Sequence, residues 1–383
     1  MTARLFTTVV ILGTGNTRIK DPLNKFWPEI CMRIREKSPQ LFFVALNRGK
    51  NYLLAKFFKK VNLIRFFKAM CLANKKSIWG KFMLHIELQH PIHTLDNKEL
   101  LPAGAILTEE TLREIVNSNG KAPSKSLSLM KFSTVRKDIF EFFNNPPYKT
   151  IFDNHEDTED VLNVMEQVIL PMPVLESLEY FREYDFHTYR HMLMIFALST
   201  LLAKILVPDY QRRIHNATAG PSHDLGKICV PVDVLLKRDP LTKDERSILF
   251  QHPIAGYVLL CYYTKDINNF SAKVARDHHE RKDGSGYARG IRQRDSLVEI
   301  VAVSDVYDAL ISPRPYRPAT FDNRTALEEI TIMAQSGQIG WDVLQALVSL
   351  NRKDKPDFRK FEVSLEKRGT PPEDNSYGKT APQ

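Results

Sequence analysis

Hydrophobic residues recur at helical spacing through most of the chain after residue 129. Residues 162–206 place apolar side chains at intervals of three and four and predict at least two helices. The same spacing predicts further helices over 242–263, 268–280, 297–312 and 323–336. Strand-like alternation is scarce in this part of the chain. We therefore expect residues 129–350 to form one mainly α domain.

The most apolar stretch of this domain covers residues 192–207. It is shorter than the roughly 20 residues that a helix needs to cross a bilayer, and it contains Lys204. We therefore expect a buried helix here rather than a transmembrane one.

A small α/β accessory region is expected before the helical domain, over residues 83–128. Residues 82–92 favour a strand, and residues 101–120 favour a turn followed by a short helix that Thr108 caps. The last ten residues of the region are rich in Ser, Lys and Pro, which predicts a linker. At the other end of the chain, residues 351–383 are charged and contain proline, so a mobile tail is expected.

Residues 1–82 differ from the rest of the chain in charge. They contain 17 Lys and Arg against 3 Asp and Glu, a net of +14, so the other 301 residues carry −5 of the total of +9. Residues 52–70 have the pattern of a basic amphipathic helix, which suits a membrane surface, nucleic acid or an acidic partner. An ordinary helix with a solvated lysine face, or a segment without stable order, is the alternative. We expect residues 1–82 to localise or regulate the protein rather than to catalyse.

Cysteine usage argues against a disulfide framework or a structural zinc site. The four cysteines show no CxxC spacing, and the N-terminus lacks a convincing signal-peptide cleavage site. We therefore expect a protein of the reducing cytoplasm.

Histidines and carboxylates cluster within the helical domain. Seven of the 11 histidines fall in residues 187–279, and Asp224 and Asp305 lie in neighbouring apolar segments. Burying so many imidazoles and carboxylates is costly unless a cation supplies the counter-charge. Imidazole and carboxylate ligands without thiolates suit Fe, Mn, Zn or Ni. The candidates exceed one tetrahedral site, and two close metal ions can promote hydrolysis of a phosphoester. The candidate ligands in these segments are His187, His191, His223, Asp224, His252, His278, His279 and Asp305.

These segments resemble a known family. HDLGK (223–227) followed by HHERKDGSGYA (278–288) is similar to the signature of HD-GYP proteins, a class of HD-domain phosphohydrolases, and the resemblance covers residues 180–335. It implies a helical domain that binds two divalent ions, Fe or Mn, and hydrolyses the bacterial messenger cyclic di-GMP to pGpG or GMP. The metal ligands that it implies are His191, His223, Asp224, His252, His278, His279 and Asp305. It also implies Asp224 as the bridging ligand and, with Lys227, as a catalytic residue. The substrate contacts that it implies are Lys227, Arg281, Gly284, Gly286, Tyr287, Arg314 and Arg317.

Two positions depart from the family pattern. His187 stands where some members have a glutamate that helps to bind a third metal ion, so a third ion is an alternative. Ala288 replaces the proline of GYP, which loosens the loop but removes no ligand atom.

Two other functions stay open: a cyclic-dinucleotide-binding regulatory module with weak catalysis, and hydrolysis of another nucleotide. Homodimer formation is open as well.

Overall fold

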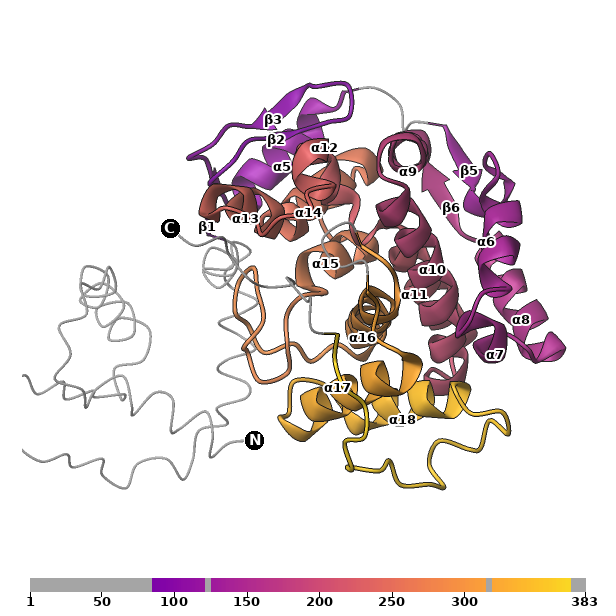
Figure 1. Cartoon of the computed structure of the whole chain (residues 1–383). Coiled ribbons are helices and arrows are strands. Elements are labelled where there is room, and N and C mark those ends of the chain that lie inside the picture. The colour runs from indigo at the N-terminus through magenta and orange to yellow at the C-terminus, as the bar shows by residue number, and fades with distance from the viewer. Residues whose placement is uncertain (1–84, 121–124, 315–318, 373–383) are drawn as a thin grey trace, which may run out of the picture. The chain divides into compact units, whose positions relative to one another are not determined.

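A computed structural model describes residues 85–120, 125–314 and 319–372, all within one compact unit of the chain (Figure 1). The basic segment 1–82, with the helix predicted over 52–70, lies outside the described residues, and so does Arg317.

The accessory region contains two short antiparallel ladders and one helix. The elements are β1 (Ile86–Glu87), β2 (Ile92–His93), β3 (Glu99–Leu101), β4 (Ile106–Leu107) and α5 (Glu109–Ser118). β1 pairs with β4 and β2 pairs with β3. Thr108 caps α5 as predicted, because its side chain accepts from the backbone N–H of Thr111 while the Thr111 hydroxyl accepts from the N–H of Thr108.

The remaining described residues form the mainly α domain that the sequence predicts (Figure 1). One short antiparallel pair, β5 (Ser126–Ser128) with β6 (Ile169–Pro171), lies at its edge. The first helices are η1 (Leu129–Lys131), α6 (Val135–Phe143), α7 (Tyr148–Ile151), α8 (His155–Glu166), α9 (Met172–Tyr184), α10 (Phe186–Leu206) and α11 (Tyr210–Ala219). The next are η2 (Gly220–Ser222), η3 (Leu225–Cys229), α12 (Val232–Leu235), α13 (Lys243–Phe250) and α14 (His252–Thr264). The last are α15 (Phe270–Asp277), α16 (Ser296–Ile311), α17 (Asn323–Gln335) and α18 (Trp341–Leu350).

Helix α10 is the central helix of this domain and packs against α8, α9, α11, α16 and η2. It is the one helix among the described residues that is long and apolar enough to cross a membrane, judged by length and composition. Because 78% of its most apolar window is buried inside the domain, it has the environment of a core helix. The buried helix predicted over 192–207 is confirmed.

The segment predicted as one helix over 242–263 is two helices, α13 and α14, which meet at Gln251. Pro253 explains the break, because proline has no N–H to donate and is tolerated only in the first turn of a helix. The hydrophobic spacing continues through the junction, so the pattern alone did not reveal it.

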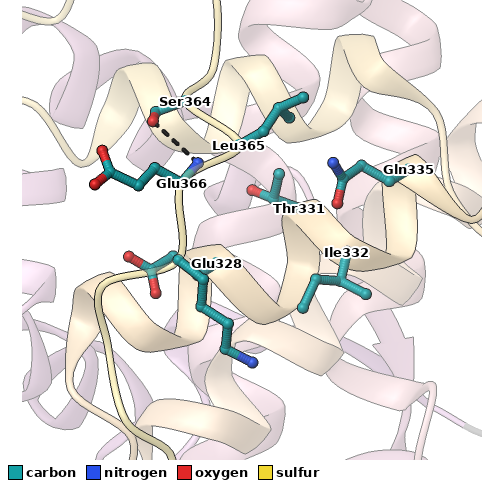
Figure 2. A pocket seen from close by; sticks show the side chains of 8 residues that line it. Glu328, Thr331, Ile332, Gln335, Ser364, Leu365 and Glu366 are labelled. Carbon is teal, nitrogen blue, oxygen red and sulfur yellow. Dashed lines mark hydrogen bonds between the residues drawn. The ribbon is translucent and has the colours of Figure 1, made fainter.

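Residues after Asn351, which the sequence predicts to be mobile, lie against α17 and α18 as far as Pro372. Ser349 of α18 donates its hydroxyl hydrogen to the carbonyl of Pro356, and Glu328 of α17 accepts from the N–H of Gly369 at 2.8 Å. The pocket between this segment and α17, shown in Figure 2, holds only about 20 Å³. That is room for about one water molecule, so this pocket is too small for a nucleotide.

Gly226 makes possible the close packing of η3 on α14. A Cβ at this position would lie 2.0 Å from the carbonyl oxygen of His252 and 2.4 Å from the backbone nitrogen of Gly256. Gly226→Ala is therefore expected to lower the unfolding free energy by about 3 kcal/mol, since neither backbone can move without distorting the helix. Urea unfolding measures the change, with Gly120→Ala as the matched control because a Cβ there meets nothing within 4 Å. Equal stability of the two variants would contradict the expectation.

Candidate metal centre

Five separate segments bring histidines and aspartates together in the core of the helical domain. His191 lies in α10, His223 and Asp224 lie between η2 and η3, and His252 is the first residue of α14. His278 and His279 follow α15, and Asp305 lies in α16. Their ligand atoms form two groups, each within 4.8 Å: Asp224, His252, His278 and His279, and then His191, His223 and Asp305. All seven predicted ligands are thus brought together.

Asp224 lies between the two groups and turns one carboxylate oxygen toward each. Its Oδ1 is 3.2 Å from Nε2 of His252 and 3.8 Å from Nε2 of His278. Its Oδ2 is 3.4 Å from Nε2 of His223 and 3.7 Å from Nε2 of His191. Asp224 is thus placed where two cations could share its carboxylate, and its bridging role stays a prediction.

Hydrogen bonds outside the cluster determine which nitrogen of four histidines faces it. Each Nδ1 lies against a carbonyl or carboxylate oxygen, which can only accept, so Nδ1 carries the proton and Nε2 keeps its lone pair. The acceptors are Gly220 O for His223 (2.7 Å), Leu249 O for His252 (2.6 Å), Ala275 O for His278 (2.8 Å) and Asp308 Oδ2 for His191 (2.6 Å). Such outer hydrogen bonds are typical of metal-ligating histidines.

Asp308 was not among the predicted site residues, and it is the partner that orients His191. It is fully buried, and its Oδ1 accepts from the hydroxyl of Tyr148 at 2.6 Å, from Arg190 Nη1 at 3.1 Å and from the hydroxyl of Ser312 at 2.9 Å. Burial opposes its charge, but the Arg190 guanidinium and the hydrogen bond from His191 hold its pKa well below the usual range. Its position one helical turn after Asp305 was the available signal.

The charge states of the cluster favour cation binding at neutral pH. Burial and the neighbouring His223 lower the pKa of His278 to about 3, and burial and His278 lower that of His279. Burial acts against ionisation of Asp224 and Asp305, but Lys227 and His223 outweigh it for Asp224 and the neighbouring His191 and His279 outweigh it for Asp305, so both pKa values are lowered. These shifts favour neutral imidazoles at His278 and His279 and ionised carboxylates at Asp224 and Asp305, as cation binding requires. Burial opposes the charge of His223, but the carboxylates of Asp224 and Asp305 outweigh it and raise the pKa of that imidazole.

The donor set fits divalent metal ions. Nε2 of His223 is buried and has no hydrogen-bond partner, and Nε2 of His252 lies 3.4 Å from Nε2 of His278, with both protons held at Nδ1. Cations placed between these nitrogen lone pairs and beside the carboxylate of Asp224 would satisfy both. Neither described cysteine belongs to the two groups, and burial raises the pKa of Cys229 to about 11.

Lys227 and His187 were also predicted as site residues, and only Lys227 lies at the centre. Lys227 lies at the centre, with Nζ 2.6 Å from Oδ2 of Asp224. His187, one turn before His191 on α10, has an exposed side chain and belongs to neither group of ligand atoms, so the structure gives no support to a third ion there.

The glycines predicted to let substrate approach have structural roles in the loop after His279. Gly284 has a φ of +88°, which closes a turn in which its N–H donates to the carbonyl of Arg281. A Cβ on Gly286 would lie 2.3 Å from the carbonyl oxygen of His279, so the chain itself occupies this space. Buried Glu280 supports the loop by accepting from the N–H groups of Arg289 and Ile291.

Tyr287 is stacked between two rings and has no free face for a base. One face meets His279, at 4.4 Å between centroids and 17° between planes, and the other meets Phe250, at 4.5 Å and 9°. Both faces of the ring are thus covered within the protein, and the predicted contact of Tyr287 with substrate stays a prediction. The peptide bond between Tyr287 and Ala288, the residue in place of the GYP proline, is cis.

Two of the three arginines predicted to contact substrate, Arg281 and Arg314, lie among the described residues. Arg281 donates from Nη1 to the carbonyls of His278 and Glu280 at 3.1 Å, so it supports the backbone of the ligand segment. Arg314 is buried, and its positive charge helps to lower the pKa of Asp308. Arg314 thus lies near the centre, and its contact with substrate stays a prediction.

Comparison with known proteins agrees with this geometry. Residues 177–343 match the family model described as HD domain. A cyclic di-GMP phosphodiesterase from Thermotoga maritima is 32% identical over 236 residues, which are 59% of this chain and 62% of that protein. The cyclic di-GMP phosphodiesterase response regulator RpfG from Xanthomonas campestris is 44% identical over 124 residues, 32% of each chain. The 3'3'-cGAMP-specific phosphodiesterase 2 from Vibrio cholerae is 33% identical over 122 residues, 31% of this chain and 23% of that protein. The chain thus spans less than two thirds of each relative.

Proposed function

We propose that this protein, whose residues 177–343 match the HD-domain family model, is a metal-dependent phosphodiesterase that hydrolyses cyclic di-GMP to pGpG, GMP or both. The observation that carries the proposal is Asp224, whose two oxygens face two separate groups of histidines. The names of the relatives from Thermotoga maritima and Xanthomonas campestris support cyclic di-GMP as the substrate.

We propose two divalent ions, Fe or Mn, held by the seven ligands, with Asp224 shared between them. Imidazole nitrogens and carboxylate oxygens without sulfur suit these metals. When bound, two such ions lower the pKa of water and neutralise charge on the phosphate oxygens.

The chain's own residues orient the substrate and place charge around it. Asp308 and the carbonyls behind the histidines keep each imidazole in the tautomer that presents Nε2. Lys227 places a positive charge beside Asp224, where it can meet a phosphate oxygen of the scissile bond. Arg314 supplies a second cation near the centre.

The direct test is hydrolysis by the purified full-length chain. Protein loaded with Fe(II) or Mn(II) under reducing conditions is incubated with cyclic di-GMP, and appearance of pGpG or GMP is the expected result. Chelator-treated protein is the control. If neither metal supports product formation, the proposed function is wrong, and tight binding of cyclic di-GMP without turnover would identify a binding module instead.

Another cyclic dinucleotide is the second candidate substrate. The relative from Vibrio cholerae is named as specific for 3'3'-cGAMP, and a metal centre recognises phosphate rather than the base. Competition between the two dinucleotides in one assay discriminates them, because the preferred substrate has the higher kcat/KM. Faster turnover of 3'3'-cGAMP would overturn the assignment of cyclic di-GMP but keep the reaction.

A further inference from the structure

A column of stacked planar side chains runs from helix α13 to the metal centre. The guanidinium carbon of Arg246 lies 4.6 Å from the ring centroid of Phe250, Phe250 stacks on Tyr287, and Tyr287 stacks on His279. Contacts between a cation and a ring, and between parallel rings, both favour this order. Only His279, at the inner end of the column, is a candidate ligand.

His279 needs such a support more than the other ligand histidines do. Its Nε2 lies 3.2 Å from Nε2 of His252, and its Nδ1 lies 3.8 Å from Oδ2 of Asp305, so both nitrogens face other ligands. The other four histidines each have a carbonyl or carboxylate outside the cluster that fixes the ring, as described above. For His279, stacking on Tyr287 fixes the ring instead of an outer hydrogen bond. Phe250 covers the opposite face of Tyr287.

Gln251 links the same helix end to the accessory region. Its Oε1 accepts from the N–H groups of Gln89 at 2.8 Å and His90 at 3.0 Å, and its Nε2 donates to the carbonyl of His90 at 2.7 Å. Gln251 stands directly between Phe250 and the ligand His252. Its amide side chain therefore holds the accessory backbone while its main chain joins α13 to α14.

Helix α13 has no buried residue, and Lys237 is bonded to its Glu245. Packing therefore contributes less to its position than it does for the core helices. A second contact to the accessory region comes from Nε2 of His90, which lies 3.0 Å from the hydroxyl of Ser247. Contacts with Gln89 and His90 thus set where the end of α13 lies.

We propose that Phe250 and Gln251 are positioning residues for the metal ligands His279 and His252, and that docking of residues 89–90 on Gln251 makes metal binding depend on the accessory region. The inference rests on the metal centre of the proposed function but not on its substrate. It gives the accessory region a regulatory role, because any change that moves Gln89 and His90 reaches two ligands through one helix junction.

The test is Mn(II) affinity of the full-length chain, measured by competition with a fluorescent chelator after metal removal. Phe250→Leu keeps an apolar side chain but removes the ring, so Mn(II) binding is expected to weaken about 10-fold. Phe250→Tyr keeps the ring and is expected to bind as the wild type does. The matched control is Phe140→Leu, because Arg136 lies over Phe140 four residues along α6 just as Arg246 lies over Phe250.

The accessory contact is tested by a second pair of variants. Gln251→Ala is expected to weaken Mn(II) binding about 10-fold, as loss of an outer support does. Lys98→Ala removes another docking contact of the accessory region, the 2.8 Å hydrogen bond from Lys98 to the hydroxyl of Tyr262, and is expected to leave affinity unchanged. Thermal unfolding of the metal-free variants separates lost stability from lost positioning.

Each outcome is decisive. Mn(II) affinity of Phe250→Leu equal to that of Phe140→Leu, or of Gln251→Ala equal to that of Lys98→Ala, overturns the inference and leaves the proposed function standing. Weakened binding in Phe250→Leu and Gln251→Ala, with restoration by Phe250→Tyr, supports it even if cyclic di-GMP is not hydrolysed. If Phe250→Leu does not fold, the comparison of Gln251→Ala with Lys98→Ala decides. A wild-type chain that binds neither Mn(II) nor Fe(II) overturns both proposals.

Discussion

Asp224→Asn is expected to lower the rate of cyclic di-GMP hydrolysis by about a thousandfold, which corresponds to about 4 kcal/mol of transition-state stabilisation. The reason lies in the two oxygens of Asp224, which face His252 and His278 on one side and His223 and His191 on the other. Asparagine keeps the volume but replaces one of these oxygens with an NH₂ group, which cannot bind a cation. The measurements are turnover of cyclic di-GMP and bound metal per chain, and one metal equivalent is expected to be lost.

Asp233→Asn is the matched control for this variant. Asp233 is an exposed residue of α12, nine positions further along the chain, and it accepts from the N–H of Val234. It should retain wild-type turnover and metal content. Full metal content in Asp224→Asn would show that this carboxylate does not bridge two ions, and unchanged turnover would remove it from the reaction.

Asp308→Asn is expected to weaken Mn(II) binding by about 10- to 100-fold without altering any direct ligand. Three donors, from Tyr148, Arg190 and Ser312, surround Oδ1 of Asp308, whereas Oδ2 accepts from Nδ1 of His191. The asparagine oxygen will face the three donors, so its NH₂ group faces His191. The His191 proton then moves to Nε2, and the lone pair that faces the centre is lost.

The same substitution is expected to lower the unfolding free energy of the metal-free protein by about 3 kcal/mol, because Arg190 loses its buried counter-charge. Urea unfolding and Mn(II) titration separate the two effects, and Asp342→Asn, an exposed change on α18, serves as the control. A variant that is destabilised but binds Mn(II) with wild-type affinity would restrict Asp308 to a structural role.

The local sequence pattern was sufficient to predict features that depend only on residues close together in the chain. Thr108 caps α5, and residues 192–206 lie within the buried helix α10, because capping and burial follow from spacing within one element. The division of 242–263 at Gln251 depended on a single proline, Pro253, whose effect on the backbone outweighs continuous hydrophobic spacing.

The loop after His279 makes contacts that local reasoning did not include. Gly286 has the residue type expected where substrate approaches, but the backbone of His279 occupies the space beside it. Tyr287 has the residue type expected for stacking on a base, but His279 and Phe250 already cover its two faces. Phe250 lies 37 positions before Tyr287, and no spacing rule relates residues in different elements at that separation.

The sequence by itself identified the candidate ligands: seven histidines and aspartates in short motifs whose residue types suit divalent metals. Only the tertiary structure decided how they are used. It divides them into two groups about the oxygens of Asp224, and it places Asp308 behind His191 and carbonyls behind three other histidines, which sets the nitrogen that each presents. Ligand identity is a property of residue type, whereas bridging and tautomer depend on distances of about 3 Å between atoms from different helices, and only packing determines those.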